Sequence, residues 1–520
     1  MSQGGKRSIP AWLRHIYLYT SRVQYPKRKE GVKMSLKLSD LLESAPGDRG
    51  QFRDAEIRGV TCDSRQVQSG TLFVAVPGHK LDGGAFIDEA IRRGAGAIVA
   101  EKAVESCPVP VIVVASARQA LADMSARFHS FPTSRMNVVG VTGTNGKTTT
   151  SYIVRSIFEA ASEKVGLLGT IQHAVGPRVL PSDNTTPGAD TLQRYFSEMV
   201  AAGCKSAVME VSSHALDQGR VRGVQFAGAV FTNLTRDHLD YHPTFESYRD
   251  AKGKLFGSLP QRAIAALNAD DDVSEHYAKQ TSAHIVYYGL KRRAEVSAAV
   301  ELATFHGTRL RLRLGTEDLR VNTRLVGTHN VYNILGAAAC TWAMGYDLEQ
   351  IKAGIENLAS VPGRLDPVDA GQDFAVLVDY AHTDDALRNV LTCLRPLLRG
   401  RLIVVFGCGG DRDRGKRPKM GRVAAELADQ VILTSDNPRS ESPTAILSDI
   451  TQGISGRTKV LVDPDRRGAI KLAISLARKD DVVLIAGKGH ENYQIFRDRT
   501  VTFDDRQVAR EVLGELAKRQ

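Results

Sequence analysis

A glycine-rich segment carries the residue types best suited to phosphate chemistry. It reads Gly-Val-Thr-Gly-Thr-Asn-Gly-Lys-Thr-Thr at 140–149, after an apolar run and before a stretch of helix-forming residues. Small residues let backbone N–H groups approach phosphate oxygens, Lys147 can reach the β- and γ-phosphates, and the Thr148 hydroxyl can bind Mg²⁺. A chance Lys-Thr pair in a glycine-rich turn would lack this strand-loop-helix context. We therefore predict a phosphate-binding loop.

This loop departs from the strict pattern at one position. Phosphate-binding loops of that pattern have glycine five residues before Gly146, where this chain has Val141. A generic GTPase or kinase is therefore a poorer match. A nucleotide triphosphatase that couples hydrolysis to movement or binding remains an alternative class.

Two further motifs contain candidate metal ligands. Glu210 ends an apolar run at 206–209, and a carboxylate after a strand is a hard oxygen ligand of the kind Mg²⁺ prefers. His238 lies in a polar run at 231–242 and is the second candidate. Asp237 and Asp240 of that run could instead cap a helix.

The last third of the chain repeats one pattern, in which an apolar run ends in a polar motif and helical stretches separate the runs. Because the carboxyl ends of parallel strands lie at one edge of a sheet, this alternation predicts a doubly wound parallel sheet with a shared ligand-binding rim. The runs are 375–378 before Asp379, 402–406 before 407–412, 431–433 before 435–439, 459–462 before 463–466, and 482–485 before 487–491.

Length and composition limit the class of protein. A chain of 520 residues is too long to fold around a single hydrophobic core, and we predict three domains, at 34–133, 134–361 and 362–520. Residues 1–33 hold +7 of the net charge of +11, and we expect them to form a basic, disordered extension. The rest of the chain is then close to neutral, so we expect no nucleic-acid binding. The apolar runs are too short to span a membrane. The six cysteines have no paired spacing suited to a zinc site or a disulfide framework, which fits a reducing compartment. We expect a cytoplasmic monomer.

Taken together, the motifs resemble those of the Mur ligases of peptidoglycan synthesis. The motifs that carry the resemblance are 143–149, Glu210-Val-Ser-Ser-His214, 233–240, His329-Asn-Val-Tyr-Asn333, Gly363-Arg364 and Asp379-Tyr-Ala-His382, in the order found in the family. The resemblance implies an α/β enzyme of three domains, with a central P-loop ATPase-type domain and a C-terminal Rossmann-like domain. It also implies that ATP and Mg²⁺ form an acyl-phosphate on a UDP-N-acetylmuramoyl substrate.

The resemblance assigns binding roles to matching positions. The ATP-contacting positions are Gly143, Thr144, Asn145, Gly146, Lys147, Thr148, Thr149, Asn333, Arg364 and Asp379. The UDP-muramoyl-dipeptide contacts are Ser64 and His79 in the first domain, with Asn184, Thr185, Thr186, Ser212, Gln218 and Arg220 in the second.

The resemblance also assigns a catalytic role to Lys252, which aligns with a lysine that family members carry as a carbamate. Carbamylation turns a cation into a carboxylate, which can hold a second Mg²⁺. Lys254 is the nearby competitor for this role. The implied catalytic residues are Lys147, Glu210, His238 and Lys252, and the implied metal ligands are Thr148, Glu210, His238 and the carbamate of Lys252.

The third domain is expected to select the amino acid. The segment Asp436-Asn437-Pro438-Arg439 has the form found in family members that add diaminopimelate, and Arg439 could grip a carboxylate in a bidentate pair. Arg412, Gly487 and Glu491 match other positions of that pocket. The expected reaction is addition of meso-2,6-diaminopimelate to UDP-N-acetylmuramoyl-L-alanyl-D-glutamate. The alternatives are addition of L-lysine, a sister ligase of folate or polymer synthesis, and a P-loop NTPase without ligase activity.

Overall fold

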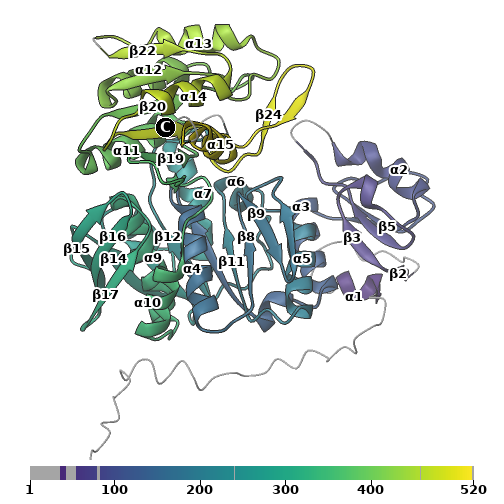
Figure 1. Cartoon of the computed structure of the whole chain (residues 1–520). Coiled ribbons are helices and arrows are strands. Elements are labelled where there is room, and N and C mark those ends of the chain that lie inside the picture. Colours follow the sequence, from purple (N-terminus) through teal and green to yellow (C-terminus); the bar gives the residue numbers. More distant parts are fainter. Residues whose placement is uncertain (1–34, 43–53, 79–81, 239–240, 457, 518–520) are drawn as a thin grey trace, which may run out of the picture. The chain divides into compact units, whose positions relative to one another are not determined.

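The computed structural model describes residues 35–42, 54–78, 82–238, 241–456 and 458–517 (Figure 1). The expected basic extension at 1–33 lies outside these residues. The chain divides into two compact units, one of residues 1–296 with 336–354 and one of residues 297–335 with 355–520. Within the described ranges, no helix is both long and apolar enough to cross a membrane.

The first unit begins with a small α/β layer. Its parallel sheet has the order β3-β4-β5-β6, and the buried side chains of β4 alternate between two clusters. Leu72 and Val74 pack with α3, whereas Phe73 packs with α2, so helices cover both faces. The elements are β1 (Leu36–Lys37), α1 (Leu38–Leu42), β2 (Glu56–Ile57), β3 (Gly59–Thr61), β4 (Thr71–Val74), α2 (Ile87–Arg92), β5 (Ala95–Ala100), β6 (Val111–Val113) and α3 (Ala117–Phe128).

A second sheet of the first unit positions the phosphate-binding loop. The sheet has eleven strands, and the part of it within this unit has the order β10-β9-β8-β11-β7-β12-β13-β14. The β8–β9 and β9–β10 pairs are antiparallel, and the strands from β8 to β14 in this order are parallel. Its strands are β7 (Asn137–Thr142), β8 (Val165–Leu168), β9 (Gln172–Val175), β10 (Arg178–Pro181), β11 (Ser206–Glu210), β12 (Gly228–Phe231), β13 (Ile264–Asn268) and β14 (His284–Gly289). Because β11, β7 and β12 are parallel neighbours, the three loops after them meet at one edge.

Helices connect these strands. They are α4 (Lys147–Ala160), α5 (Ala189–Ala201), α6 (Ser213–Asp217), α7 (Phe245–Gly257) and α8 (Val273–Ala278), followed by α9 (Thr328–Ala343) and α10 (Leu348–Asn357), which contain residues of both units. Thr244 caps α7 by accepting the Ser247 N–H, in a capping box with the Ser247 side chain. Asp237 therefore does not cap this helix, and Asp240 lies outside the described residues.

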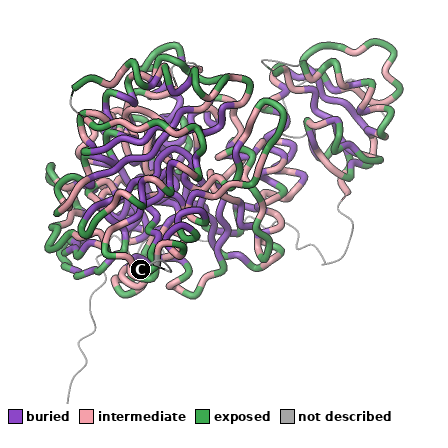
Figure 2. The backbone as a smooth tube through the Cα atoms, turned by 45° about the horizontal axis from the view of Figure 1, so that its top comes forward, coloured by how far each residue is buried: buried purple, intermediate pink, exposed green. Residues whose placement is uncertain are grey.

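The second unit contains the doubly wound sheet that the sequence predicts. The order is β18-β19-β23-β20-β21-β22, with only β18 antiparallel. Figure 2 shows buried backbone through the interior of this unit, and the strands β19, β23, β20 and β21 are nearly all buried, whereas the edge strand β22 is exposed at both ends. Successive residues of each strand pack on opposite faces, as in β20, where Val404 contacts the cluster of α11–α13 and Val405 contacts that of α14 and α15. Four of the five apolar runs are thus strands buried on both sides, and the fifth, at 459–462, is the partly exposed edge strand β22.

The elements of this unit begin with a meander of β15 (Val296–Thr304), β16 (Gly307–Leu314) and β17 (Glu317–Thr323). The sheet strands are β18 (Asp366–Pro367), β19 (Ala375–Asp379), β20 (Leu402–Phe406), β21 (Gln430–Leu433), β22 (Lys459–Val462) and β23 (Val482–Ala486). The helices are α11 (Asp384–Leu394), α12 (Lys416–Leu427), α13 (Pro443–Thr451), α14 (Arg466–Leu476) and α15 (Asp505–Ala517), and β24 (Tyr493–Ile495) with β25 (Thr500–Thr502) forms a hairpin.

A buried ion pair ties two helices to the rim of this sheet. Arg466 begins α14 and Asp505 begins α15, and both side chains are inaccessible to solvent. The guanidinium donates to both carboxylate oxygens of Asp505 at 2.7 Å. It also donates to the carbonyl of Ser435, just after β21, at 3.2 Å, and to that of Ala486, the last residue of β23, at 3.1 Å. The pair therefore fixes the backbone from which the two rim loops leave.

We expect Arg466→Met to destabilise the second unit by about 3–5 kcal/mol, because it leaves the Asp505 carboxylate buried without a partner. Hydrogen exchange of β21 and β23 measures this loss. The control is Arg467→Met, which removes a half-exposed pair with Glu511 and is expected to change stability by less than about 1 kcal/mol. Equal, small effects of the two substitutions would contradict the role given to the buried pair.

Candidate functional site

Two glycines shape the loop between β7 and α4. Gly143 and Gly146 have φ values of 149° and 86°, in the region that side chains other than glycine rarely adopt. A Cβ at Gly143 would also collide with the Thr232 hydroxyl. The loop is held on its far side by Asn233, which accepts from the Asn145 N–H and donates to the Asn145 carbonyl, both at 3.1 Å. The geometry is that of a phosphate cradle leading into a helix N-terminus.

Two lysines converge on one backbone carbonyl of this loop. Lys147 Nζ lies 2.9 Å from the Gly143 oxygen and 2.7 Å from the Thr144 oxygen. Lys252 Nζ, from α7, lies 2.8 Å from the same Gly143 oxygen. Lys252 is only 1% exposed, and burial together with the nearby Lys147 ammonium holds its pKa well below the usual range. An anion bound nearby would favour the charged form of both lysines.

Glu210 joins the loop to the end of β11. Its Oε2 accepts from the Thr148 hydroxyl and from the Thr170 hydroxyl, both at 3.0 Å, and its Oε1 accepts the Thr170 N–H at 2.8 Å. Glu210 and Thr148 are both buried. The two side chains predicted to bind Mg²⁺ are therefore neighbours, and both offer hard oxygen atoms. The sequence did not reveal Thr170, because its contact with Glu210 depends on the pairing of β8 with β11.

His238 lies in an aromatic cluster and has a strained backbone, with φ of 53°. Its ring centroid is 5.0 Å from that of His214, which in turn lies 4.1 Å from Tyr241. Partial burial lowers the pKa of His238 to about 4, although Asp237 opposes the shift. The imidazole is therefore neutral near pH 7, which is the form that binds metals. Among the described residues, no three His, Cys, Asp or Glu side chains gather in a metal-binding cluster.

The predicted muramoyl-dipeptide contacts of the second sheet are linked to the Glu210 end of β11. The Thr186 hydroxyl donates to the Glu210 carbonyl at 2.8 Å and accepts the Ser212 N–H at 3.1 Å. Arg220 donates to the Thr186 carbonyl at 2.9 Å and to Gln218 Oε1 at 2.7 Å. These four residues form one hydrogen-bonded group beside the phosphate loop.

The remaining predicted contacts of this substrate are less closely connected. The Thr185 hydroxyl lies 3.1 Å from that of Thr170, and the Asn184 carbonyl accepts from Ser182. Ser64 is buried in the first layer, where its hydroxyl donates to Glu89 at 2.9 Å. His79 lies outside the described residues.

Three predicted ATP contacts lie in the second unit. The Arg364 guanidinium lies 4.9 Å from the centre of the Tyr380 ring. Asp379 accepts the N–H groups of Leu365 and Ala381 at 2.7 and 2.8 Å, and burial raises its pKa while Arg364 opposes the shift. Asn333, on α9, donates to Asn330 at 3.0 Å. Asp379 thus holds the turn that carries Arg364.

The loop after β21 and the loop after β23 form one polar cluster. Asn437 Nδ2 donates to Glu491 Oε2 at 2.9 Å, and Gln494 Nε2 donates to the Asp436 carbonyl at 2.8 Å. Arg439 has φ of 52°, and its N–H donates to the Ile495 carbonyl at 3.0 Å. Hairpin β24–β25 therefore supports an unfavourable Arg439 backbone, as is common in binding loops.

The other predicted members of the amino-acid pocket line the same rim. A Cβ at Gly487 would lie 2.7 Å from Asp436 Oδ2, so glycine is required for this close approach. The Pro438 carbonyl lies against Gly410, whose Cβ would collide with it. Arg412 is exposed and donates to the Asp411 carbonyl at 3.1 Å.

Lys488 is a member of this cluster to which the sequence motifs gave no role. Its side chain is inaccessible to solvent, and its Nζ donates to Asn437 Oδ1 at 3.1 Å and to Glu491 Oε2 at 3.0 Å. The sequence feature that could have identified Lys488 is its position between Gly487 and Glu491, directly after a buried strand. A lysine there is surrounded by buried positions and needs counter-charges.

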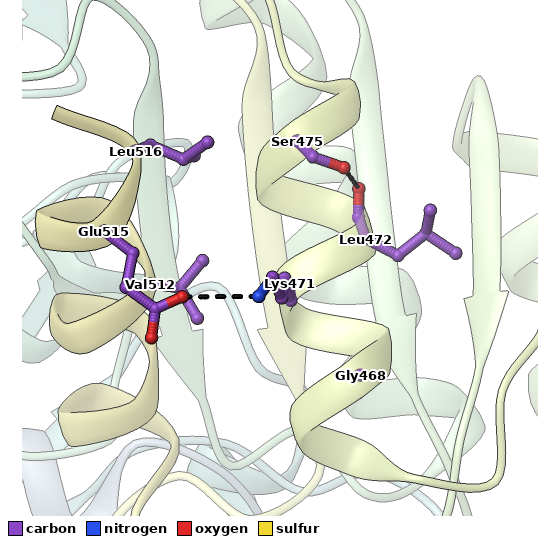
Figure 3. Close-up of a pocket in the computed structure, with 7 residues that line it drawn as sticks. All are labelled: Gly468, Lys471, Leu472, Ser475, Val512, Glu515 and Leu516. Carbon is purple, nitrogen blue, oxygen red and sulfur yellow. Dashed lines mark hydrogen bonds and ion pairs between the residues drawn. The ribbon is translucent and has the colours of Figure 1, made fainter. Parts of the chain in front are cut away.

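A hollow of about 290 Å³ lies between α14 and α15 in the second unit (Figure 3). Its walls are mostly aliphatic, and Lys471 forms an ion pair with Glu515 at 3.3 Å across it. None of the predicted site residues lines it. Its residues are Gly468, Lys471, Leu472, Ser475, Val512, Glu515 and Leu516.

Comparison with known families gives three consecutive matches. Residues 56–129 match the catalytic domain of the Mur ligase family, residues 141–341 match the Mur ligase middle domain, and residues 363–489 match the Mur ligase glutamate ligase domain. The matches contain the phosphate-binding loop, Glu210, Lys252 and the Asp436–Arg439 segment.

Similar proteins agree with these matches. The chain is 48% identical over 488 residues to the UDP-N-acetylmuramoyl-L-alanyl-D-glutamate–2,6-diaminopimelate ligase of Geobacillus kaustophilus (strain HTA426), covering 92% of this chain and all of the relative. It is 47% identical over 500 residues to the ligase of that name from Geobacillus thermodenitrificans (strain NG80-2), with the same coverage. A solved structure of a ligase of that name is 34% identical, with a TM-score of 0.66 over 89% of this chain and 95% of that one. The chain therefore belongs to the Mur ligase family.

Proposed function

We propose that this protein is an ATP-dependent amide ligase that adds meso-2,6-diaminopimelate to UDP-N-acetylmuramoyl-L-alanyl-D-glutamate. The observation that carries the proposal is that Asn437 and Arg439, in the loop after β21, and Glu491, in the loop after β23, belong to one cluster at the rim of a doubly wound sheet. Two relatives, 47–48% identical over their whole length, are named as ligases of these substrates, which supports the proposal.

Phosphoryl transfer is assigned to the loop between β7 and α4. A carboxylate oxygen of the D-glutamyl residue attacks the γ-phosphorus of ATP, the bond to ADP breaks, and an acyl-phosphate forms. Lys147 and the loop N–H groups stabilise the charge in transfer. The amine of the incoming amino acid then attacks the acyl carbon, phosphate leaves with one former carboxylate oxygen, and an amide remains.

The residues present fit a Mg²⁺ ion. Thr148 and Glu210 are buried neighbours with hard oxygen atoms, and His238 is a neutral imidazole. Mg²⁺ bound to these groups would neutralise phosphate charge. We assign the same role to a carbamate on Lys252, formed when Nζ adds to CO₂ and loses a proton. This supplies the further carboxylate that the described residues lack.

The amino-acid pocket has groups for both charges of an amino-acid head. Arg439 can pair with a carboxylate through two parallel hydrogen bonds, and Asp436 and Glu491 offer oxygen atoms to an ammonium. We place Asn437, Pro438, Arg412 and Gly487 in the same pocket. Meso-diaminopimelate carries such a head at each end, whereas lysine carries only an ammonium at its distal end.

We further propose that segments 34–133, 134–361 and 362–520 are the three domains, which bind the UDP-substrate, ATP and the amino acid. The three family matches fall within these segments. Ser64, His79, Asn184, Thr185, Thr186, Ser212, Gln218 and Arg220 are assigned to the UDP-substrate, and Asn333, Arg364 and Asp379 to ATP. We expect the enzyme to act in the cytoplasm as a monomer.

Two alternatives give different results. A lysine-adding enzyme would keep its amino-acid selectivity after Arg439→Ala. A P-loop NTPase without ligase activity would release ADP and form no amide. A sister ligase with another acceptor is disfavoured by the Asp436–Arg439 segment.

The function is tested by incubating the purified protein with ATP, Mg²⁺ and UDP-N-acetylmuramoyl-L-alanyl-D-glutamate, with meso-diaminopimelate, L-lysine or no amino acid. Product mass and ADP release are measured. We expect a mass increase only with meso-diaminopimelate. Product with lysine would contradict the pocket assignment, and ADP release without product in all three mixtures would contradict the ligase.

The role of Lys252 is tested by Lys252→Met. We expect product formation to fall by about a hundredfold or more, because the carbamate that would help to hold Mg²⁺ is lost. Acetate or formate is expected to restore part of the rate. Lys254→Met is the matched control on the same helix, since Lys254 is exposed and pairs with Asp217. Near-full activity of Lys252→Met would contradict the assignment.

A further inference from the structure

Lys488 lies at the centre of the polar cluster formed by Asp436, Asn437 and Glu491. Besides its two hydrogen bonds, its Nζ lies 3.9 Å from Asp436 Oδ1 and 5.5 Å from the centre of the Tyr493 ring. A fully buried ammonium is stable only with acceptors and counter-charges around it. The side chain is therefore part of the architecture of this pocket and not a solvated surface lysine.

Lys488 fixes the orientation of the Asn437 amide. Oδ1 of Asn437 accepts from Lys488 at 3.1 Å and from the Ile495 N–H at 3.0 Å, so Nδ2 is left to donate to Glu491. A flipped amide would place its NH₂ group against two donors. Glu491 Oε2 in turn receives both Nδ2 of Asn437 and Nζ of Lys488. Two predicted ligand-binding residues are thus held in one arrangement before any ligand binds.

Lys488 also sets the formal charge of the pocket. Asp436 and Glu491 contribute −1 each, and Lys488 and Arg439 contribute +1 each, so the four side chains sum to zero. Without Lys488 the same residues would carry −1. A neutral pocket with separated charges complements a zwitterionic head, whereas a pocket with net negative charge complements an ammonium alone.

The neighbouring charges do not alter this balance. Arg466 lies beneath the same loops, but it is paired with the buried Asp505. Arg412, which we assign to the pocket, and its neighbour Asp411 have opposite charges that cancel in the formal sum, and both are exposed, so solvent screens them.

We propose that Lys488 is a positioning and specificity-determining residue, which orients Asn437 and Glu491 and favours an amino acid with a zwitterionic distal end over one with a distal ammonium alone. The inference rests on the proposed function, because it concerns the amino acid consumed in that reaction. It adds a residue that does not need to touch the substrate.

The test compares kcat and KM for meso-diaminopimelate and L-lysine in the full-length wild type, Lys488→Met and the double variant Lys488→Met/Glu491→Gln. We expect Lys488→Met to raise the KM for meso-diaminopimelate by about tenfold or more, and to lower its kcat/KM relative to that for lysine by a similar factor. The KM for ATP should stay within about twofold. The double variant restores formal neutrality, so its selectivity should return toward that of the wild type.

The double variant removes the buried ion pair as a whole and remains measurable if Lys488→Met alone does not fold. Lys471→Met is the matched control, because Lys471 is an exposed lysine of the same unit, paired with Glu515 (Figure 3). It is expected to leave every constant unchanged. The proposal is overturned if Lys488→Met loses kcat/KM equally for both amino acids, or if it lowers kcat at constant KM. It is also overturned if the double variant is no more selective for meso-diaminopimelate than Lys488→Met.

Failure of the proposed function would look different. The wild type itself would then form no amide with either amino acid. In that case, isothermal titration calorimetry measures the affinities for meso-diaminopimelate and for L-lysine, and so shows whether Lys488 affects the choice between them. Stronger binding of meso-diaminopimelate by the wild type, reversed or lost in Lys488→Met, supports the proposal, and unchanged relative affinities overturn it.

Discussion

The phosphate site depends on a single backbone carbonyl, that of Gly143, which accepts from both Lys147 and Lys252. Burial and the Lys147 ammonium disfavour the charged form of Lys252 unless negative charge is added nearby. A triphosphate can supply that charge, and so can a carbamate on one of the lysines. The left-handed backbone of Gly143, the packing of Thr232 against it and the burial of α7 all serve to hold this arrangement.

The same principle recurs, with opposite sign, in the second unit. There two carboxylates, Asp436 and Glu491, lie around the buried Lys488, while Arg439 adds a second positive charge at the rim. In both units the loops that build the site follow parallel strands, where they can converge without interrupting the sheet. The strands provide rigidity through residues buried on both faces, and the loops provide the chemistry.

Much of this arrangement was predictable because it is local or follows from strand order. The strand-loop-helix context identified the loop at 140–149, and apolar runs ending in polar motifs identified the doubly wound sheet. Partners across the fold were not predictable. The contact of Thr170 with Glu210 requires the register of β8 with β11, and the contact of Lys488 with Asn437 requires two loops to meet. The left-handed backbones of His238 and Arg439 were also not predicted, and at Arg439 the hydrogen bond to Ile495 that supports this conformation comes from a segment distant in sequence.

The central claim is that the carboxylate of the acceptor is activated by phosphorylation before the amide forms. The most direct measurement uses acceptor whose D-glutamyl carboxylate is labelled with oxygen-18, followed by mass analysis of the phosphate released during ligation. The mechanism predicts one labelled oxygen in each phosphate, because a carboxylate oxygen becomes the bridge of the acyl-phosphate and leaves with phosphorus. Phosphate free of the label, released alongside the amide product, would contradict it.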